Sequence, residues 1–153
     1  MVVILTVASL CAGMFYSCSR NISKPVIESY VGPADKVEVV YFHRPKRCEA
    51  CLFAEERTKY VINIHFKDQL AEGKITIAIY GVTDDSIQDI RKKFGAYGSQ
   101  LFVNRIKDGI NHIRYVAEIW NWECLDNAEL FDATLIKVIN TNLYGSQAAA
   151  VNQ

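Results

Sequence analysis

The chain has 153 residues and half of them are hydrophobic, which is enough sequence for one domain with a sizeable core. Its 17 lysines and arginines balance its 17 aspartates and glutamates. The overall charge therefore gives no electrostatic reason to expect nucleic acid as a partner or binding to an acidic surface.

The first 18 residues suggest export from the cytoplasm. Residues 1–16 carry no charged side chain and are mostly apolar, a length that suits the hydrophobic core of a signal peptide and is short for a membrane span of about 20 residues. The segment ends in a small residue, Ser17, followed by Cys18, as in the loosely patterned lipoprotein signals of some Gram-negative bacteria. We expect residues 1–18 to be a signal peptide or a membrane or lipid anchor, Cys18 to be the lipidation candidate, and the protein to be periplasmic or attached to the cell envelope.

Residues 19–35 are mostly polar, contain two prolines and a glycine, and show no sustained hydrophobic period. They predict a tether, with a segment lying along the domain surface as the alternative. The folded domain is expected over residues 36–143. The small and polar residues 144–153 predict a flexible tail.

Two cysteines follow the first predicted strand. Residues 37–43 are β-branched and aromatic and predict a strand, and a proline-broken loop then leads to Cys48 and Cys51, where a helical pattern begins. The unpaired N–H groups and dipole at a helix start should lower the pKa of Cys48 below its free value of about 8.5, so Cys48 is the candidate nucleophile. Cys51, about one turn later on the same face, is the candidate resolving thiol.

Charged residues beside the two cysteines should tune the thiolate. Arg44, Lys46 and Arg47 in the preceding loop stabilise it, and Glu49 between the cysteines opposes them. Three cations against one anion predict a net lowering of the thiol pKa.

Helices and strands alternate after the motif. One long helix is expected to end near Gly73, with Phe53, Tyr60, Ile64 and Leu70 forming its apolar stripe. Residues 75–80 are apolar at almost every position, which predicts a central strand covered on both faces. A short helix over residues 86–94 is expected next, capped by Asp84 or Asp85 and ended by Gly95.

The last part of the domain predicts a hairpin and a helix. Residues 101–106 and 111–116 flank an Asp-Gly turn at residues 107–109, which is a strong hairpin signal. Asp126 can cap a final helix over residues 128–143, whose expected inner face is Leu130, Phe131, Leu135, Val138, Ile139 and Asn142.

This order of elements, with a Cys-x-x-Cys motif at a strand-to-helix junction, resembles the thioredoxin-like superfamily over residues 36–143. More narrowly, residues 39–51 and 97–103 look like those of small exported bacterial thioredoxin-like proteins that are sometimes labelled a nitrophenyl-compound nitroreductase subunit. The resemblance implies an α/β fold with a central mixed sheet of about four strands and flanking helices. It also implies disulfide exchange with protein thiols or disulfides and with an upstream electron donor or acceptor, without a bound cofactor.

The chain departs from ordinary thioredoxins in and around the motif. Glu49 and Ala50 replace Gly-Pro between the cysteines, and Arg47 replaces the usual tryptophan. The first strand has Tyr41, Phe42 and His43 where thioredoxins bury a carboxylate that helps to deprotonate the resolving thiol.

The loop expected to face the motif also differs, since Gly98, Ser99 and Gln100 stand where thioredoxins have a cis-proline. These three residues are the candidate substrate groove. A cis bond before a residue other than proline costs about 2.5 to 4 kcal/mol, so a trans peptide is expected at Ser99.

Two other functions remain open. One is a non-catalytic thioredoxin-fold subunit or adaptor in a cell-envelope complex, which the altered groove favours. The other is a metal carrier using Cys48 and Cys51, with His43 and Cys124 completing a set of ligands for zinc or copper(I). Cys124 is otherwise a third redox thiol or, as we favour, a small buried hydrophobic residue.

Overall fold

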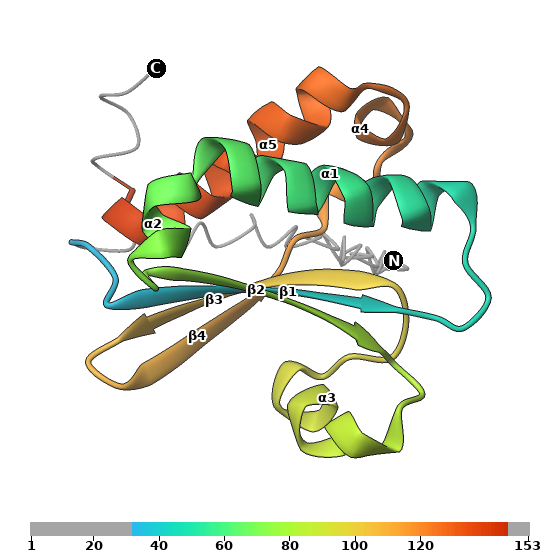
Figure 1. Cartoon of the computed structure of the whole chain (residues 1–153), viewed down its shortest axis with the longest axis horizontal. Coiled ribbons are helices and arrows are strands. Elements are labelled where there is room, and N and C mark those ends of the chain that lie inside the picture. The colour runs from blue at the N-terminus through green and yellow to red at the C-terminus, as the bar shows by residue number, and fades with distance from the viewer. Residues whose placement is uncertain (1–31, 147–153) are drawn as a thin grey trace, which may run out of the picture.

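The computed structural model describes residues 32–146. The predicted signal segment with Cys18, residues 19–31 of the predicted tether and residues 147–153 of the predicted tail lie outside this range. Within it, the chain is an α/β domain with a four-stranded mixed sheet and helices on both faces, as expected (Figure 1). None of the helices between residues 32 and 146 has the length and apolar character needed to cross a membrane.

The sheet has the strand order β2-β1-β3-β4. Strand β1 (Lys36–His43) runs parallel to β2 (Ile75–Gly81) and antiparallel to β3 (Gln100–Lys107), which in turn pairs antiparallel with β4 (Ile110–Tyr115). The prediction that residues 75–80 form a central strand is wrong, because β2 lies at one edge. A run of apolar residues indicates that both faces of a strand are covered. It does not indicate whether the strand has a hydrogen-bonded neighbour along both edges.

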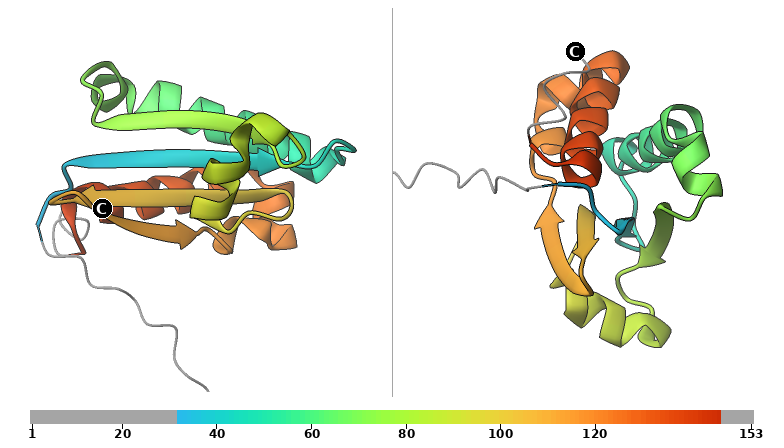
Figure 2. Two further views of the ribbon diagram at one scale, coloured as in Figure 1. Left: turned by 90° about the horizontal axis from the view of Figure 1, so that it is seen from below. Right: turned by 90° about the vertical axis from the view of Figure 1, so that its left-hand side faces the viewer.

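Helices cover the two faces unequally (Figures 1 and 2). One face carries α1 (Glu49–His65), α2 (Lys67–Ala71), α4 (Trp122–Asp126) and α5 (Ala128–Tyr144). The other carries the 3-10 turn η1 (Asp85–Ile87) and α3 (Gln88–Phe94), and a further 3-10 turn, η2 (Glu118–Trp120), follows β4.

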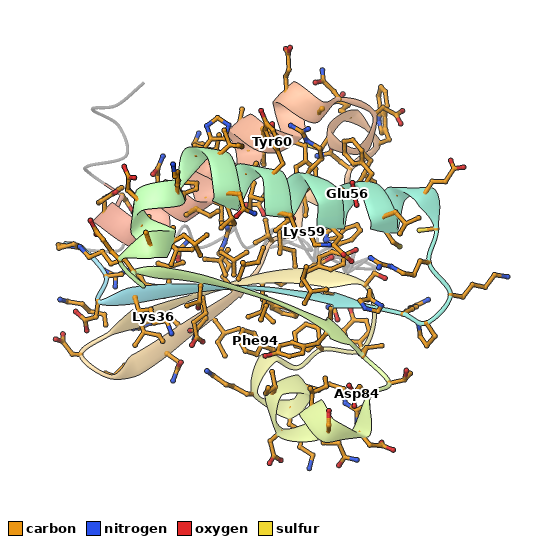
Figure 3. All side chains as sticks on the ribbon, in the orientation of Figure 1. Lys36, Glu56, Lys59, Tyr60, Asp84 and Phe94 are labelled. Carbon is orange, nitrogen blue, oxygen red and sulfur yellow. The ribbon has the colours of Figure 1, made fainter. Side chains whose placement is uncertain are left out.

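Strand β1 is buried on both faces because its side chains alternate between two cores. Val37, Val39 and Tyr41 pack into the larger core, beneath α1 and α5. The smaller core on the opposite face includes Phe42 and Phe94, and Phe94 points from α3 toward the sheet (Figure 3). Strand β1, which leads into the two cysteines, is thus packed between a core on each face of the sheet.

The long helix expected up to Gly73 is two helices, broken at Phe66. Phe66 is buried in the larger core and has non-helical backbone angles. The predicted apolar stripe is only half correct. Phe53 and Leu70 pack against the larger core, but Tyr60 and Ile64 are exposed, and Tyr60 lies on the side of α1 away from the sheet (Figure 3). The buried face of α1 consists of Cys51, Ala54, Glu55, Thr58, Val61 and Ile62.

Most of the predicted local signals are confirmed. Asp84 caps η1 by accepting a hydrogen bond from the Ser86 N–H, and Gly95 ends α3 with φ of 64°. The hairpin turn between β3 and β4 has positive φ at both Asp108 (51°) and Gly109 (75°), as the Asp-Gly pair predicted.

The cap of the final helix was assigned to the wrong residue. Asn127, not Asp126, accepts the hydrogen bond from the Leu130 N–H, because Asp126 is the last residue of α4, a short helix that the sequence pattern did not predict. Leu130, expected on the inner face, is 39% exposed.

The described part of the predicted tether belongs to the domain. Ala34 is buried and its N–H donates to the Leu143 carbonyl (2.7 Å), while the Asp35 N–H donates to the Ile106 carbonyl (2.9 Å). At the other end, Tyr144 is still part of α5, and its hydroxyl accepts a hydrogen bond from Gln69.

Candidate functional site

The two cysteines of the motif lie where β1 gives way to α1. Cys48 is the N-cap residue of α1, and its sulfur accepts a hydrogen bond from the Cys51 N–H (3.3 Å). The sulfur therefore takes the place that a serine or aspartate oxygen has in an ordinary N-cap, where the helix dipole stabilises negative charge. Cys48 is exposed, so an incoming disulfide or thiol can reach it.

Cys51 lies behind Cys48 and is only 9% exposed. Its carbonyl accepts a hydrogen bond from the Tyr41 hydroxyl (2.8 Å), which ties the first turn of α1 to the C-terminal half of β1. Burial acts to raise the pKa of the Cys51 thiol, but hydrogen bonds from Cys48 and Ser99 and the charge of Arg47 outweigh it and bring the pKa below its usual value. Of the two thiols, Cys48 is therefore the more exposed, and the surroundings of Cys51 favour its charged form.

The loop before β3 faces the cysteines, as expected from the sequence. The Ser99 hydroxyl accepts a hydrogen bond from the Arg44 N–H (3.4 Å), and it acts to lower the pKa of the Cys51 thiol. Gly98 and Gln100 are buried, and the Gln100 side chain accepts hydrogen bonds from the N–H groups of Tyr97 and Gly98. Ser99 thus contacts the loop that leads into the cysteines, while Gln100 shapes its own loop.

Between residues 32 and 146 every peptide bond is trans, including the bond before Ser99, as expected for a residue other than proline. The Arg44 guanidinium lies over this loop, since a Cβ atom added at Gly98 would be 3.2 Å from Arg44 Nη2. A side chain at position 98 would therefore displace Arg44.

A buried ion-pair cluster, which the sequence analysis missed, lies beneath the pair. Glu55 is 7% exposed and forms ion pairs with Arg47 and with Lys59 (2.5 Å). Burial alone would raise the pKa of Glu55, but the bonds to Lys59 and Arg47 lower it overall, so the carboxylate is charged at neutral pH. Glu55 follows Cys51 by four residues and shares its helix face, and this spacing is the signal that could have revealed it.

The three cations of the predicted basic loop have different surroundings. Arg44 and Lys46 are exposed, whereas Arg47 is half-buried and paired with Glu55. The Nε atom of Arg47 is buried and has no hydrogen-bond partner among residues 32–146. Burial raises the pKa of the neighbouring Tyr41, and the nearby Cys51 and Glu55 add to this effect. The hydroxyl of Tyr41 therefore stays protonated beneath the motif.

The proposed metal ligands do not come together. His43 lies at the end of β1 with its Nδ1 atom 3.1 Å from the Arg44 carbonyl, and Cys124 is buried in α4 with its sulfur 3.8 Å from Thr134 Oγ1. In the part of the chain that the structure describes, no three His, Cys, Asp or Glu side chains are close enough to hold a metal ion together. The burial of Cys124 confirms that it is a small core residue.

No protein-family model, curated protein or solved structure matches this chain.

Alkylation of the reduced protein is expected to label Cys48 well before Cys51. Cys48 is exposed and its sulfur lies at the helix start, whereas Cys51 is covered. Brief treatment with iodoacetamide near neutral pH followed by peptide mapping checks this, with buried Cys124 as the internal control. Preferential labelling of Cys51 would reverse the two assigned roles.

Proposed function

We propose that this domain has a thioredoxin-like fold and is a thiol-disulfide oxidoreductase with Cys48 as the nucleophile and Cys51 as the resolving thiol. The order of its elements supports the fold: the strand order is β2-β1-β3-β4, with β1 and β2 parallel and the cysteines at the junction of β1 and α1. The hydrogen bond from the Cys51 N–H to the exposed Cys48 sulfur is the observation that carries the function.

The reaction uses the two thiols in sequence. The Cys48 thiolate attacks one sulfur of a substrate disulfide, the substrate S–S bond breaks, and its second sulfur leaves as a thiolate. Cys51 then loses its proton and attacks Cys48 in the mixed disulfide, which releases the first substrate sulfur and forms the Cys48–Cys51 disulfide. The substrate gains two electrons and the protein loses two. The reverse sequence oxidises a substrate dithiol.

No step of this exchange requires a bound cofactor, because the electrons pass between sulfur atoms. The partners are protein thiols or disulfides and a separate electron donor or acceptor. We further propose that the protein is exported and works in the periplasm or at the cell envelope, with attachment through Cys18 as the lipidation candidate. Metabolic labelling with a radioactive fatty acid, compared with Cys18→Ala, tests that attachment.

Equilibration with glutathione buffers tests the redox function. After thiol trapping, the Cys48–Cys51 pair should show one two-electron transition, between about −270 and −120 mV. Glu49 is exposed in the first turn of α1, where its charge opposes a neighbouring thiolate, so Glu49→Gln should raise the potential by roughly 5 to 20 mV. Glu56→Gln, two turns farther along α1, is the matched control and should leave the potential unchanged.

If the pair forms no disulfide in any buffer, the protein is not an oxidoreductase. If Glu49→Gln lowers the potential, the electrostatic account of the motif is wrong even though the pair is redox-active.

A non-catalytic subunit or adaptor is the second candidate, because the Arg44 guanidinium covers Gly98 in the loop where a substrate chain would pair. Arg44→Ala separates the two functions. If the protein is an oxidoreductase whose groove Arg44 obstructs, this substitution should speed disulfide exchange with a peptide substrate. If the protein is a non-catalytic subunit, both wild type and Arg44→Ala should lack exchange activity.

A further inference from the structure

Strand β2 lies at an edge of the sheet, and its outer side has no neighbouring strand among residues 32–146. Every residue from Thr76 to Gly81 is partly exposed, whereas most of β1 is buried. Figure 2 shows β2 along one margin of the sheet, on the side of β1 away from β3 and β4. The outer edge of β2 is therefore accessible to another strand.

The bonds between β1 and β2 show which peptide groups face this edge. The Lys74 carbonyl accepts a hydrogen bond from the Val37 N–H (2.8 Å), and the Val82 N–H donates to the His43 carbonyl (2.8 Å). Successive residues of a strand direct their N–H and C=O groups to opposite edges, so the even-numbered residues of β2 bond to β1. The N–H and C=O groups directed at the open edge belong to Ile75, Ile77 and Ile79.

The sequence of β2 does not protect this edge from pairing. Edge strands of soluble proteins usually carry a charge, a proline or a bulge that discourages pairing with another chain. Strand β4, at the opposite edge, has the charged residue Arg114. The seven residues of β2 include no charged residue and no proline, and their register with β1 is uninterrupted. Ile77 and Ile79 are apolar and only partly covered by the larger core. Strand β2 thus suits a partner on its outer side.

The charges that flank β2 fit a second copy of the same strand. Lys74 precedes it, Asp84 and Asp85 follow it, and all three are exposed and have no ion pair within the described residues. Glu72 lies at the end of α2, before the turn at Gly73 (φ 71°). A strand with opposite charges at its ends is complementary to itself when it runs antiparallel, because the lysine of each copy then approaches the aspartates of the other.

The place where the described chain begins favours a second copy over the protein's own N-terminal residues. The Gly32 carbonyl accepts a hydrogen bond from the Arg105 side chain of β3 (2.8 Å), and the Asp35 N–H donates to the Ile106 carbonyl (2.9 Å). The chain therefore enters β1 from the side of β3. A segment continuing from Gly32 would have to pass across β1 to reach the outer edge of β2.

We propose that β2 pairs antiparallel with β2 of a second copy of this chain, so that two four-stranded sheets join across a two-fold axis at Ala78. Around this axis Ile77 of each copy lies opposite Ile79 of the other, and the two residues exchange N–H···O=C hydrogen bonds. Ala78 lies opposite its own copy, where its small side chain suits the Cα separation of about 4.5 Å.

This inference is independent of the proposed redox function and compatible with it. Because β1 runs parallel to β2, Cys48 lies beyond the C-terminal end of both strands. Antiparallel pairing therefore places the two Cys48 residues at opposite ends of the joined sheet, and both remain open to substrate.

Sedimentation equilibrium of the full chain tests the proposal. Reducing buffer prevents intermolecular disulfides, and mild detergent keeps the apolar residues 1–16 from associating. A single pair of strands is smaller than a standard interface, so the dimer should form over about 1 to 100 μM. Ala78→Lys and Ala78→Glu should each weaken the dimer about 10-fold or more, because like charges then face each other across the axis. An equimolar mixture of the two variants should restore it.

Ile110→Lys and Ile110→Glu are the matched controls. They place the same charges on the exposed first residue of β4, at the other edge of the sheet, and should leave the dimer unchanged. Circular dichroism verifies that each variant is folded.

Hydrogen exchange of the wild-type protein gives a second measurement that requires no variant. The outward amides of β2 should exchange more slowly as the protein concentration rises, because the dimer occupies them. Mass spectrometry of the peptide that covers residues 75–81 measures this exchange, and the peptide that covers β4 should not change with concentration.

Several results would overturn the proposal. These are a wild-type protein that stays monomeric up to about 100 μM, Ala78 variants that dimerise as strongly as wild type, and folded Ala78 variants whose mixture does not dimerise. A dimer that only the Ile110 variants disrupt would place the interface on β4. Protection of residues 75–81 at every concentration in a monomer would assign the edge to the protein's own residues outside 32–146.

Discussion

Replacing Cys48 by serine is expected to reduce disulfide exchange by at least about 10³-fold, because covalent catalysis disappears with its nucleophile. Cys48 is the thiol that a substrate can reach, and its sulfur accepts a hydrogen bond from the Cys51 N–H in the first turn of α1. A serine hydroxyl at this N-cap position would preserve the helix, so the loss would be chemical and not structural. The initial rate of reduction of a disulfide-linked peptide, followed by chromatography, measures the effect.

Cys51→Ser should behave differently. Cys48 still attacks the substrate, but the mixed disulfide has no resolving thiol and accumulates, and mass spectrometry of the acid-quenched reaction detects it as a protein with one substrate chain attached. Cys124→Ser is the matched control, since Cys124 is buried in α4 and should not affect exchange. Trapping of substrate on Cys51 in Cys48→Ser would instead make Cys51 the attacking thiol.

Replacing Glu55 by glutamine is expected to lower the free energy of unfolding by about 1 to 3 kcal/mol at neutral pH. The neutral amide leaves Arg47 without its anion in a half-buried site. The lower end of this range applies if water solvates the charges of Arg47 and Lys59 after the carboxylate is lost, since these side chains are 24% and 44% exposed.

The difference between wild type and Glu55→Gln should depend on pH in one direction. The folded state lowers the pKa of Glu55, so the unfolded chain binds this proton more readily. The stabilisation is therefore fully present above the unfolded value of about 4.3 and is lost as the pH falls through the lower folded value. Urea unfolding at pH 7 and near pH 3 measures it.

Glu56→Gln is the control for this experiment. Glu56 is the next residue of α1 and is exposed on the outer side of the helix (Figure 3), so its free energy of unfolding should change little at either pH. A Glu55→Gln protein that is as stable as wild type at neutral pH, or whose deficit persists unchanged in acid, would show that the ion pairs of Glu55 do not stabilise the fold.

The elements that the sequence determined by itself are those set by short-range forces. The Asp108-Gly109 turn needs positive φ at two successive residues, which few other pairs adopt, and Gly95 ends α3 for the same reason. The Cys-x-x-Cys spacing likewise places one sulfur on the N-terminus of α1 and the other one turn behind it. Each of these outcomes depends on residues that are neighbours in the chain.

Tertiary structure alone decided how the site is completed. Ser99 lies beside the start of the motif, where its hydroxyl accepts a hydrogen bond from the Arg44 N–H, only because β3 pairs beside β1 and brings the loop at residues 95–99 to the end of the sheet where α1 begins (Figure 1). Glu55 lies beneath Arg47, which pairs with it over the first turns of α1. The sequence pattern predicts a solvated carboxylate on a helix at this position, but in the folded protein Glu55 is part of the site. Phe66 breaks the long helix because the core accepts its ring, and Asn127 takes the cap because α4 uses Asp126. Burial is the common reason: the free energy of a polar or aromatic side chain depends on what other elements place around it, and a local pattern does not contain that information.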